Sequence, residues 1–595
     1  MPIDERALLA RPIPSDIAAE LDRYEATVAE YLAGTLDEDT FRVFRLNNGV
    51  YGQRQGGHNQ MVRVKIPYGQ VTAEQFEVLA HISEHFSRGW GHLTTRQNVQ
   101  FHFVQLEQSA TVLRLLAACG LTSREACGDT VRNVCGCHLA GACPFEVLDI
   151  SPWAEATARY LLRHPYAQRL PRKFKINFSG CATDCGQAMF NDVGVIAVGR
   201  PRPDGTIEAG FRVVLAGGLG ATPHPAQALE DFTSREDLLP TIEACLRTFD
   251  HYGNRDNKLR ARMKWLVDTM GIDELRERIL KERKFLRGSV SWPGGVPALV
   301  TEVGDAPAGT GTGPVTGAPG AAPVRLLATD PFERWAEANV VRGVANGTVS
   351  AYAYCDLGDI TTEQFIGLAA IQRDFDLDVR VTARQNLVLR DLTEGDLRGL
   401  YERLDELGMA KPGAELARDV VACPGADTCN LAVTQSRGLA DAIGIALDNA
   451  GLAEVGGVRV NISGCTNSCG QHHIADIGFF GMERRAHGQA APGYQMLLGG
   501  HLGDAQVEFG DKATKLPARN APEAVVRVVQ RFADERNAGE TFSGWLTRSG
   551  GAGAVGAALT TLDAFPDPAD DPGFYVDFGE TGPYVKEVGD SECAT

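Results

Sequence analysis

The sequence lacks three features that would place it in other classes of protein. It contains no run of eighteen or more apolar residues, so we expect no membrane-spanning helix. Its first residues are polar and acidic and lack the apolar stretch of a secretory signal, so we expect a cytoplasmic protein. Positive charge is outnumbered, with 58 Lys and Arg against 76 Asp and Glu and a formal net charge of −18. This balance does not favour non-specific nucleic-acid binding, although it is compatible with a local basic pocket for a small anion.

The sequence does contain fourteen cysteines, and four of them form a motif. Cys423 and Cys429 have five residues between them, and Cys465 and Cys469 have three. Thiolates are the ligands that select iron–sulfur clusters, zinc or Cu(I). The spacing differs from the paired knuckles of structural zinc sites and from the cysteine run of bacterial ferredoxins. Because no export signal is expected, the cysteines indicate metal or redox ligands and not disulfides.

A second motif consists of cations in the first half of the chain. Arginine offers a planar fork to the oxygens of a small anion, and a lysine whose pKa is lowered can also give up a proton. Any one such cation alone would be interpreted as a solvated surface residue. Two of them, two residues apart on an expected strand, point to the same face and favour a shared pocket. The four candidates are Arg63, Arg132, Lys173 and Lys175.

The second half of the chain repeats the first. Separate motifs keep their order and stay near an offset of 284–289 residues, which indicates duplication of a whole unit. A duplicated unit implies a pseudo-two-fold molecule with sites between its halves. The matching segments are Gln70–Phe76 with Asp359–Phe365, Thr94–Asn98 with Thr382–Asn386, and Phe178–Gln187 with Ile462–Gln471.

Two local patterns predict elements in the first half. Thr72 and Gln75 form a capping-box signal, which predicts the start of an amphipathic helix. The run from Leu93 to Phe103 is strand-like and predicts one strand.

The cysteine motif, within Val-Asn-Ile-Ser-Gly-Cys465-Thr-Asn-Ser-Cys469-Gly-Gln, resembles the cluster site of the sirohaem-containing nitrite and sulfite reductases. The contexts Met-Val-Arg63-Val-Lys, Asp-Thr-Val-Arg132-Asn-Val and Pro-Arg-Lys173-Phe-Lys175 resemble the same family. The resemblance covers the chain from about residue 45 to 550. In that family, the matching cations lie over the open face of sirohaem and hold the substrate anion.

The resemblance implies an α+β fold that is internally duplicated. It predicts two ferredoxin-like half-domains and two sirohaem/Fe–S reductase domains in a pseudo-two-fold arrangement. The expected limits are a helical arm at 1–45, half-domain 1 at 46–115, reductase domain 1 at 120–298, a Gly/Pro-rich linker at 299–325, half-domain 2 at 326–412, reductase domain 2 at 415–550 and an acidic tail at 560–595.

The resemblance also implies one sirohaem and one 4Fe–4S cluster, with Cys469 bridging the cluster and the sirohaem iron. Sirohaem carries many carboxylates, so its pocket must be basic and rich in hydrogen-bond donors. His102 is equally compatible with a buried core histidine. The residues that resemble tetrapyrrole contacts are Thr95, Arg96, Gln100, His102 and Asn133.

The first half carries the same cysteine spacing as the second. These cysteines either hold a second 4Fe–4S cluster or persist from the duplication as small buried hydrophobic residues. Cys135 is an extra thiol nearby that complicates the count. The four matching cysteines are Cys137, Cys143, Cys181 and Cys185.

The two halves differ in their cations. At the repeat offsets, Arg63 corresponds to Tyr352 and Lys173 to Gly457, so the second copy lacks two of the four cations. One productive pocket, built from N-half cations over the C-half cluster, therefore fits better than two.

These features predict an oxidoreductase that reduces sulfite to sulfide, with nitrite reduction to ammonia as the alternative. Family nitrite reductases often carry Asn where this chain has Lys175, and sulfite reductases carry Lys, which favours sulfite. No flavin or nicotinamide domain is visible, so we expect electrons from a separate donor such as ferredoxin. A non-enzymatic iron–sulfur electron carrier is a further alternative, but it would need the cysteines and not the cations.

The acidic tail contains one more cysteine. Cys593 is the third residue from the end. It is either a thiol that carries sulfur or reaches the active site from a mobile tail, or an idle exposed thiol.

Overall fold

The computed structural model describes residues 3–299, 326, 328–342 and 347–589. Cys593 and all but the first residue of the expected linker lie outside the described residues. No helix in the described part of the chain combines the length and the apolar character that crossing a membrane requires. The mixture of helices and sheets confirms the predicted α+β class.

Two five-stranded antiparallel sheets each take one strand from the other half of the chain. The first has the order β1-β2-β5-β4-β13, and β13 (Asp359–Thr361) comes from the second half. The second has the order β11-β12-β15-β14-β3, and β3 (Gln70–Val71) comes from the first half. The other strands are β1 (Val50–Gly52), β2 (Asn59–Val64), β4 (Trp90–Leu93), β5 (Val99–Gln105), β11 (Val340–Val341), β12 (Val349–Ala353), β14 (Asp378–Val381) and β15 (Leu387–Leu392).

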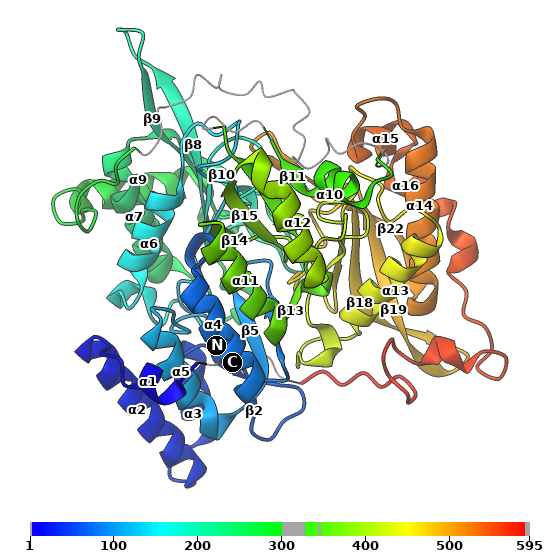
Figure 1. Cartoon of the computed structure of the whole chain (residues 1–595), viewed down its shortest axis with the longest axis horizontal. Helices are drawn as coiled ribbons and strands as arrows, with labels where there is room; N and C mark the ends of the chain where they lie inside the picture. Colours follow the sequence, from blue (N-terminus) through cyan, green and yellow to red (C-terminus); the bar gives the residue numbers. More distant parts are fainter. Residues whose placement is uncertain (1–2, 300–325, 327, 343–346, 590–595) are drawn as a thin grey trace.

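Helices α4 (Ala73–Phe86) and α11 (Thr362–Asp374) join the two half-domains. Helix α4 begins with a capping box between Thr72 and Gln75, which confirms the sequence signal, and α11 begins with the repeat of it. The helices lie side by side (Figure 1), and the buried side chains of both half-domains form one hydrophobic core. The further helices of this region and of the N-terminal arm are α1 (Glu5–Leu9), α2 (Ser15–Leu32), α3 (Glu38–Asn47), α5 (Ser109–Ala118), α10 (Pro331–Asn339) and α12 (Leu397–Glu406).

Each reductase domain is built on a five-stranded mixed sheet, with the orders β10-β9-β8-β7-β6 and β16-β17-β18-β19-β22. Strands β7 and β17 occupy equivalent places, run parallel to both neighbours, and lead directly to the cysteine pair with three intervening residues. The strands are β6 (Cys135–Gly136), β7 (Ile176–Ser179), β8 (Val193–Pro201), β9 (Ile207–Leu215), β10 (Gln227–Thr233), β16 (Val421–Ala422), β17 (Val460–Ser463), β18 (Ile477–Ala486), β19 (Gln489–Leu498) and β22 (Asp511–Pro517), with a separate hairpin of β20 (His501–Gly503) and β21 (Gln506–Glu508).

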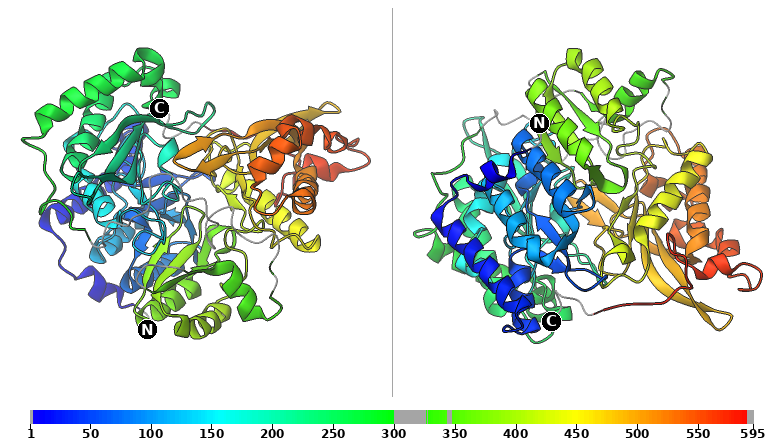
Figure 2. Two further views of the ribbon diagram at one scale, coloured as in Figure 1. Left: turned by 90° about the horizontal axis from the view of Figure 1, so that it is seen from above. Right: turned by 60° about the horizontal axis from the view of Figure 1, so that its bottom comes forward.

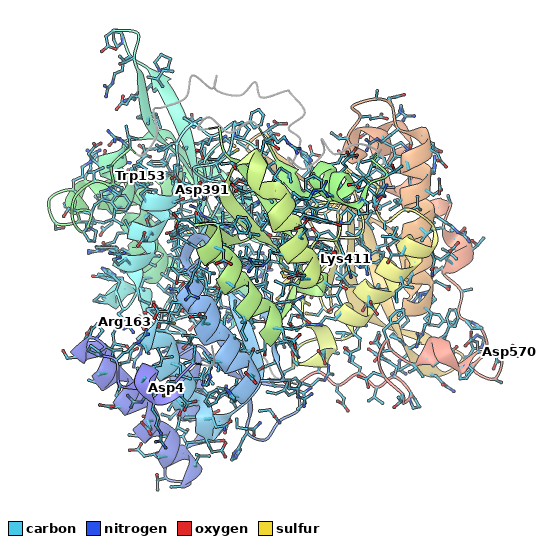
Figure 3. All side chains as sticks on the ribbon, viewed as in Figure 1. Asp4, Trp153, Arg163, Asp391, Lys411 and Asp570 are labelled. Atoms are coloured by element: carbon cyan, nitrogen blue, oxygen red, sulfur yellow. The ribbon has the colours of Figure 1, made fainter. Side chains whose placement is uncertain are left out.

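Helices complete the core of each reductase domain. In the first domain, the buried Trp153 (Figure 3) packs edge-on against Phe211, with 5.7 Å between ring centroids. The second domain forms the orange lobe at the right of both views in Figure 2. The helices are α6 (Ser151–Leu161), α7 (Arg235–Tyr252), α8 (Lys264–Met270) and α9 (Ile272–Leu286) in the first domain, and α13 (Ser436–Asn449), α14 (Ala521–Glu535), α15 (Phe542–Arg548) and α16 (Gly551–Ala557) in the second.

The segment from Leu93 to Phe103, expected as one strand, is instead the end of β4, a tight turn and β5. The Thr94 hydroxyl accepts hydrogen bonds from the backbone N–H groups of Arg96 and Asn98 at 3.2 Å each. Gln97 adopts a φ of 56° between them. A threonine side chain that caps its own backbone in this way favours a turn over a continuous strand.

Candidate active site

The four cations of the first half come from segments that meet beside β7. Arg63 lies on β2, and Arg132 lies just before β6. Lys173 and Lys175 flank Phe174 in an extended segment that leads into β7, and not in the strand itself as expected. Alternate residues of an extended segment still point to one side, and the charge of Lys173 acts on Lys175.

Backbone carbonyls hold the two arginines. Arg132 donates to Ala126 O at 2.9 Å and to Gly128 O at 2.9 and 3.2 Å. Arg63 Nη1 donates to the same Ala126 O at 3.2 Å and lies 3.6 Å from Cys127 Sγ. Because one carbonyl serves both guanidinium groups, their positive ends lie side by side. A carbonyl fixes their position without cancelling their charge as a carboxylate would.

The two lysines are bound less tightly than the arginines. Within the described part of the chain, neither ammonium group has a hydrogen bond or an ion pair. Burial lowers the pKa of Lys173 to about 8, and Arg172 and Arg132 act in the same direction. Burial, followed by the guanidinium of Arg96, holds the pKa of Lys175 well below its ordinary value. An anion that enters this pocket would relieve the crowding of like charges.

Cys469 of the second half meets the first half of the chain at this pocket. Thr95 Oγ1 donates to the Cys469 carbonyl at 3.0 Å, and the thiolate charge of Cys469 acts on Lys173. Gln471 and its repeat counterpart Gln187 hydrogen-bond to each other at 2.7 and 2.9 Å across the junction. The structure thus brings the N-half cations and a C-half cysteine together.

The C-half cysteines fit a cluster better than a single ion. Cys423, Cys429 and Cys465 are partly buried, and Cys469 is exposed. Burial first, and the Cys469 thiolate second, raise the pKa of Cys423 and raise that of Cys429 to about 12, so a positive core among them is needed to keep them ionised. Among the described residues, no three His, Cys, Asp or Glu side chains converge on one ion position. An iron–sulfur core takes one thiolate at each of its corners and suits a quartet of cysteines.

Orphaned polar atoms mark the expected tetrapyrrole side of the pocket. Arg96 is anchored by Asn177 Oδ1 at 3.0 Å and by the Asn133 carbonyl at 2.6 Å. Arg96 Nε and Asn133 Oδ1 are buried, and neither has a hydrogen-bond partner among the described residues. Buried polar atoms are normally paired, so these two atoms fit a polar group that completes the site.

Gln100 and His102, two residues apart on β5, have different surroundings. With its amide turned to face Arg63, the Gln100 oxygen accepts hydrogen bonds from that guanidinium at 2.6 and 2.8 Å. His102 stacks on Trp90 with 5.6 Å between ring centroids, and burial lowers its pKa to about 3. Gln100 therefore orients the guanidinium of Arg63, while His102 lies among aromatic rings as a neutral imidazole.

Sequence reasoning missed an ion pair under the lysines. The Asp192 carboxylate accepts a hydrogen bond from the Lys175 backbone N–H at 2.9 Å and pairs with Arg262 at 2.7 Å. The dense basic run from Arg260 to Lys264 was the available signal. Cys135 also proves to lie on the cation side of the domain, where its Sγ donates to the Arg96 carbonyl at 3.3 Å.

The acidic tail packs on the cysteine loop at 423–436. Tyr584 donates its hydroxyl to the Val433 carbonyl at 3.0 Å, and the Gly589 N–H donates to the Asn430 carbonyl at 2.9 Å. Figure 1 shows this segment (red) returning from the C-terminal domain toward the centre of the molecule. The tail therefore braces the loop that presents two of the cluster cysteines.

Two truncations separate the tail contacts from Cys593. Cutting after Gly589 removes Cys593 but keeps the contacts, so we expect unchanged steady-state kinetics. Cutting after Gly579 also removes the Tyr584 and Gly589 hydrogen bonds, each worth about 1 kcal/mol. We expect that protein to lose its cluster absorbance in air several-fold faster. Lower activity in the Gly589 truncation, with the cluster intact, would instead assign a function to Cys593.

Comparisons with known proteins agree with this organisation. A family model described as the nitrite and sulphite reductase 4Fe-4S domain matches residues 127–285 and 413–552. A model described as the nitrite/sulfite reductase ferredoxin-like half domain matches residues 51–119 and 345–407. Each model matches once in each half, which confirms the predicted duplication.

Individual relatives span most of the chain. An assimilatory ferredoxin-dependent nitrite reductase of Haloferax mediterranei is 30% identical over 519 residues, which cover 84% of each protein. A ferredoxin sulfite reductase of Mycobacterium tuberculosis is 30% identical over 529 residues, covering 84% of this chain and 87% of the relative. The solved structure of the Mycobacterium tuberculosis NirA protein superposes with a TM-score of 0.71 at 28% identity, covering 87% of this chain and 91% of that one.

Proposed function

We propose a substrate, an electron donor and a cofactor arrangement for this chain, which belongs to the nitrite and sulphite reductase family. It is an oxidoreductase, and its main reaction is the six-electron reduction of sulfite to sulfide, with electrons supplied by a reduced ferredoxin. Relatives named for sulfite and for nitrite are equally similar to it, so the choice between the two anions rests on the chemistry of the pocket.

The cofactors of this proposal are a 4Fe–4S cluster and sirohaem. The thiolates of the C-half quartet would hold the cluster, and Cys469, whose charge acts on Lys173, would also help to hold the sirohaem. Arg96 Nε and Asn133 Oδ1 would complete their hydrogen bonding on the tetrapyrrole side. When bound, the cluster and sirohaem together pass electrons one at a time to the substrate.

The four cations perform the binding and the proton delivery. Arg63 and Arg132, fixed by the Ala126 carbonyl, present a preorganised positive pair to the oxygens of the anion. Lys173 and Lys175 are ammonium groups with lowered pKa values, so they can release protons as oxygen leaves. Their backbone stays in place because Asp192 anchors it.

The contact between Thr95 and Cys469 is the observation that carries this proposal, and it is supported by the effect of the Cys469 charge on Lys173. An electron carrier would have no use for two ammonium groups that lack a hydrogen bond or ion pair within the described residues. The test is anaerobic turnover of the purified protein with reduced ferredoxin, measuring sulfide from sulfite and ammonia from nitrite. Absence of both products from a protein that carries sirohaem would overturn the proposal.

Nitrite is the second candidate substrate. The same four cations accept any small oxyanion, and the nitrite reductase of Haloferax mediterranei is as similar to this chain as the mycobacterial sulfite reductase. A kcat/KM for nitrite that strongly exceeds that for sulfite in the turnover assay would select nitrite.

The pKa of Lys173 predicts an alkaline limit to activity. With a pKa of about 8, this group is a cation below that pH and loses its charge above it. We expect kcat/KM for nitrite, which keeps a single charge throughout, to fall above pH 8. In Lys173→Arg, the fall in kcat/KM should occur at a higher pH, because arginine stays protonated. A fall at the same pH in this variant would contradict the assignment of the alkaline limit to Lys173.

A loss of stability caused by Lys173 cannot account for the expected fall in activity above pH 8. The group's pKa is lower in the folded protein than its ordinary value of 10.5, so the unfolded chain binds more protons between pH 8 and 10.5. The contribution of Lys173 to the free energy of unfolding therefore rises with pH over that window while activity falls. Thermal melting at each pH is the control.

A further inference from the structure

The N-half cysteines, taken as a quartet of Cys137, Cys143, Cys181 and Cys185, gather at one place in the structure. Cys143 faces Cys181, and Cys137 faces Cys185. The four side chains of the N-half quartet therefore lie together and are not dispersed through the core.

The backbone that presents the two quartets carries the same hydrogen bonds. The Cys137 N–H donates to the Phe178 carbonyl at 3.0 Å, and the Cys423 N–H donates to the Ile462 carbonyl at 3.2 Å. The next loop repeats the match, since the bond from residue 147 to residue 180 and the bond from residue 433 to residue 464 both measure 2.8 Å. Both loops therefore hold their cysteines in equivalent frames.

Equivalent glycines also bring the chain close to itself below each quartet. A Cβ added at Gly186 would lie 1.9 Å from the Phe178 carbonyl oxygen, and one added at Gly470 would lie 2.0 Å from that of Ile462. Each position directly follows the last cysteine of its quartet. A side chain would clash there in either half, so the close backbone approach below the C-half quartet, called here the glycine cradle, also occurs in the N-half.

The neighbouring pocket differs from the cation side in its side chains and charges. Tyr352, in the place of Arg63, shares a 2.8 Å hydrogen bond with His138 next to Cys137. Glu415 lies 3.3 Å from Arg384 and from Arg459, so it neutralises guanidinium groups that would otherwise attract carboxylates. His138 Nδ1, buried and facing this pocket, has no hydrogen-bond partner in the described chain.

We propose that the N-half quartet holds a second iron–sulfur cluster, of the four-iron type, without a tetrapyrrole attached. The shared cysteine spacing, the matching backbone bonds and the glycine cradle supply the ligand frame. Tyr352, His138 and Glu415 close the side on which the C-half cluster would meet sirohaem. The unpartnered His138 nitrogen is a hydrogen-bond group available to the sulfur of such a cluster.

The test is the metal content of the anaerobically purified holoenzyme. We expect about eight irons and eight acid-labile sulfides per chain beyond the sirohaem iron, because two four-iron clusters are present. About four irons would overturn the proposal, and so would one zinc per chain in elemental analysis. Reduced samples should show two distinct cluster signals in electron paramagnetic resonance.

A matched pair of double variants locates the iron. Cys143→Ser with Cys181→Ser should lower the count to about four and leave the sirohaem absorption bands in place. Cys429→Ser with Cys465→Ser should also remove about four irons but abolish the sirohaem bands. Unchanged iron in the first variant would overturn the proposal. If that variant does not fold, the wild-type count decides alone.

The second cluster and the proposed function can be disproved independently of each other. A wild-type protein with about four irons that reduces sulfite would overturn the second cluster and keep the function. A protein with about eight irons and sirohaem, but without sulfide or ammonia production, would do the reverse.

Discussion

A Cys469→Ser variant is expected to lose sulfite reduction by about 100-fold or more, together with its sirohaem absorption bands. Substitutions that only orient a metal ligand already cost about 10–100-fold, and Cys469 is proposed to be a ligand itself. Serine keeps the size of the side chain but offers a hard, poorly ionised hydroxyl where a soft thiolate is needed. Turnover with reduced ferredoxin and the visible spectrum of the purified variant measure the two effects.

The matched control is Cys185→Ser at the repeat position. This variant should keep the sirohaem bands, because Cys185 faces the pocket closed by Tyr352. Cys119→Ser, at a thiol that belongs to neither quartet and donates to the Leu116 carbonyl at 3.2 Å, is a control for the general effect of replacing a cysteine. Normal turnover and a normal sirohaem spectrum in Cys469→Ser would show that the C-half site is wrongly assigned.

Lys175→Asn should reduce kcat/KM for sulfite more than kcat/KM for nitrite. Near neutral pH, sulfite is partly a dianion, whereas nitrite carries one charge. One unit charge near 4 Å is worth about 4 kcal/mol at an effective dielectric constant of 20, before desolvation reduces it. Because the attraction scales with the charge of the anion, a loss of about 10-fold for nitrite corresponds to about 100-fold for fully dianionic sulfite.

The lowered pKa of Lys175 adds a second effect of the same sign. Burial lowers its pKa, so its ammonium group releases a proton more readily than that of an ordinary lysine. Asn has no such proton to give to the departing oxygen. The variant should therefore lose kcat as well as affinity for sulfite.

Arg459→Asn is the matched control for Lys175→Asn. Arg459 occupies the repeat position but pairs with Glu415 in the closed pocket, so its loss should not distinguish sulfite from nitrite. Equal losses for both anions in Lys175→Asn, or a wild type that strongly prefers nitrite, would contradict the prediction that sulfite is the main substrate.

The sequence was most informative where a local rule decides the structure. Thr72 and Gln75 form the predicted capping box because both partners lie within one helical turn. The duplication was visible because motifs kept their order, and both family models confirm it. The cysteine and cation candidates were found through residue types whose chemistry is restrictive.

The errors and omissions came from contacts between distant segments. The side-chain cap from Thr94 turned an expected strand into a hairpin, and alternation alone could not reveal it. Asp192 and Arg262 are 70 residues apart, so only the fold shows that they support Lys175. The tail brings Tyr584 to Val433, 151 residues away, although its composition is that of an unstructured segment.

The exchange of β3 and β13 between the two half-domain sheets bears on the ancestry of the chain. A polypeptide of half this length would leave each sheet one strand short, with an open edge beside β4 or β14. It would have to complete that edge with a second copy of itself around a two-fold axis. The present chain has the architecture of two such copies joined covalently. Joined copies need not be identical in sequence, and here one has Arg63 and Lys173 where the other has Tyr352 and Gly457.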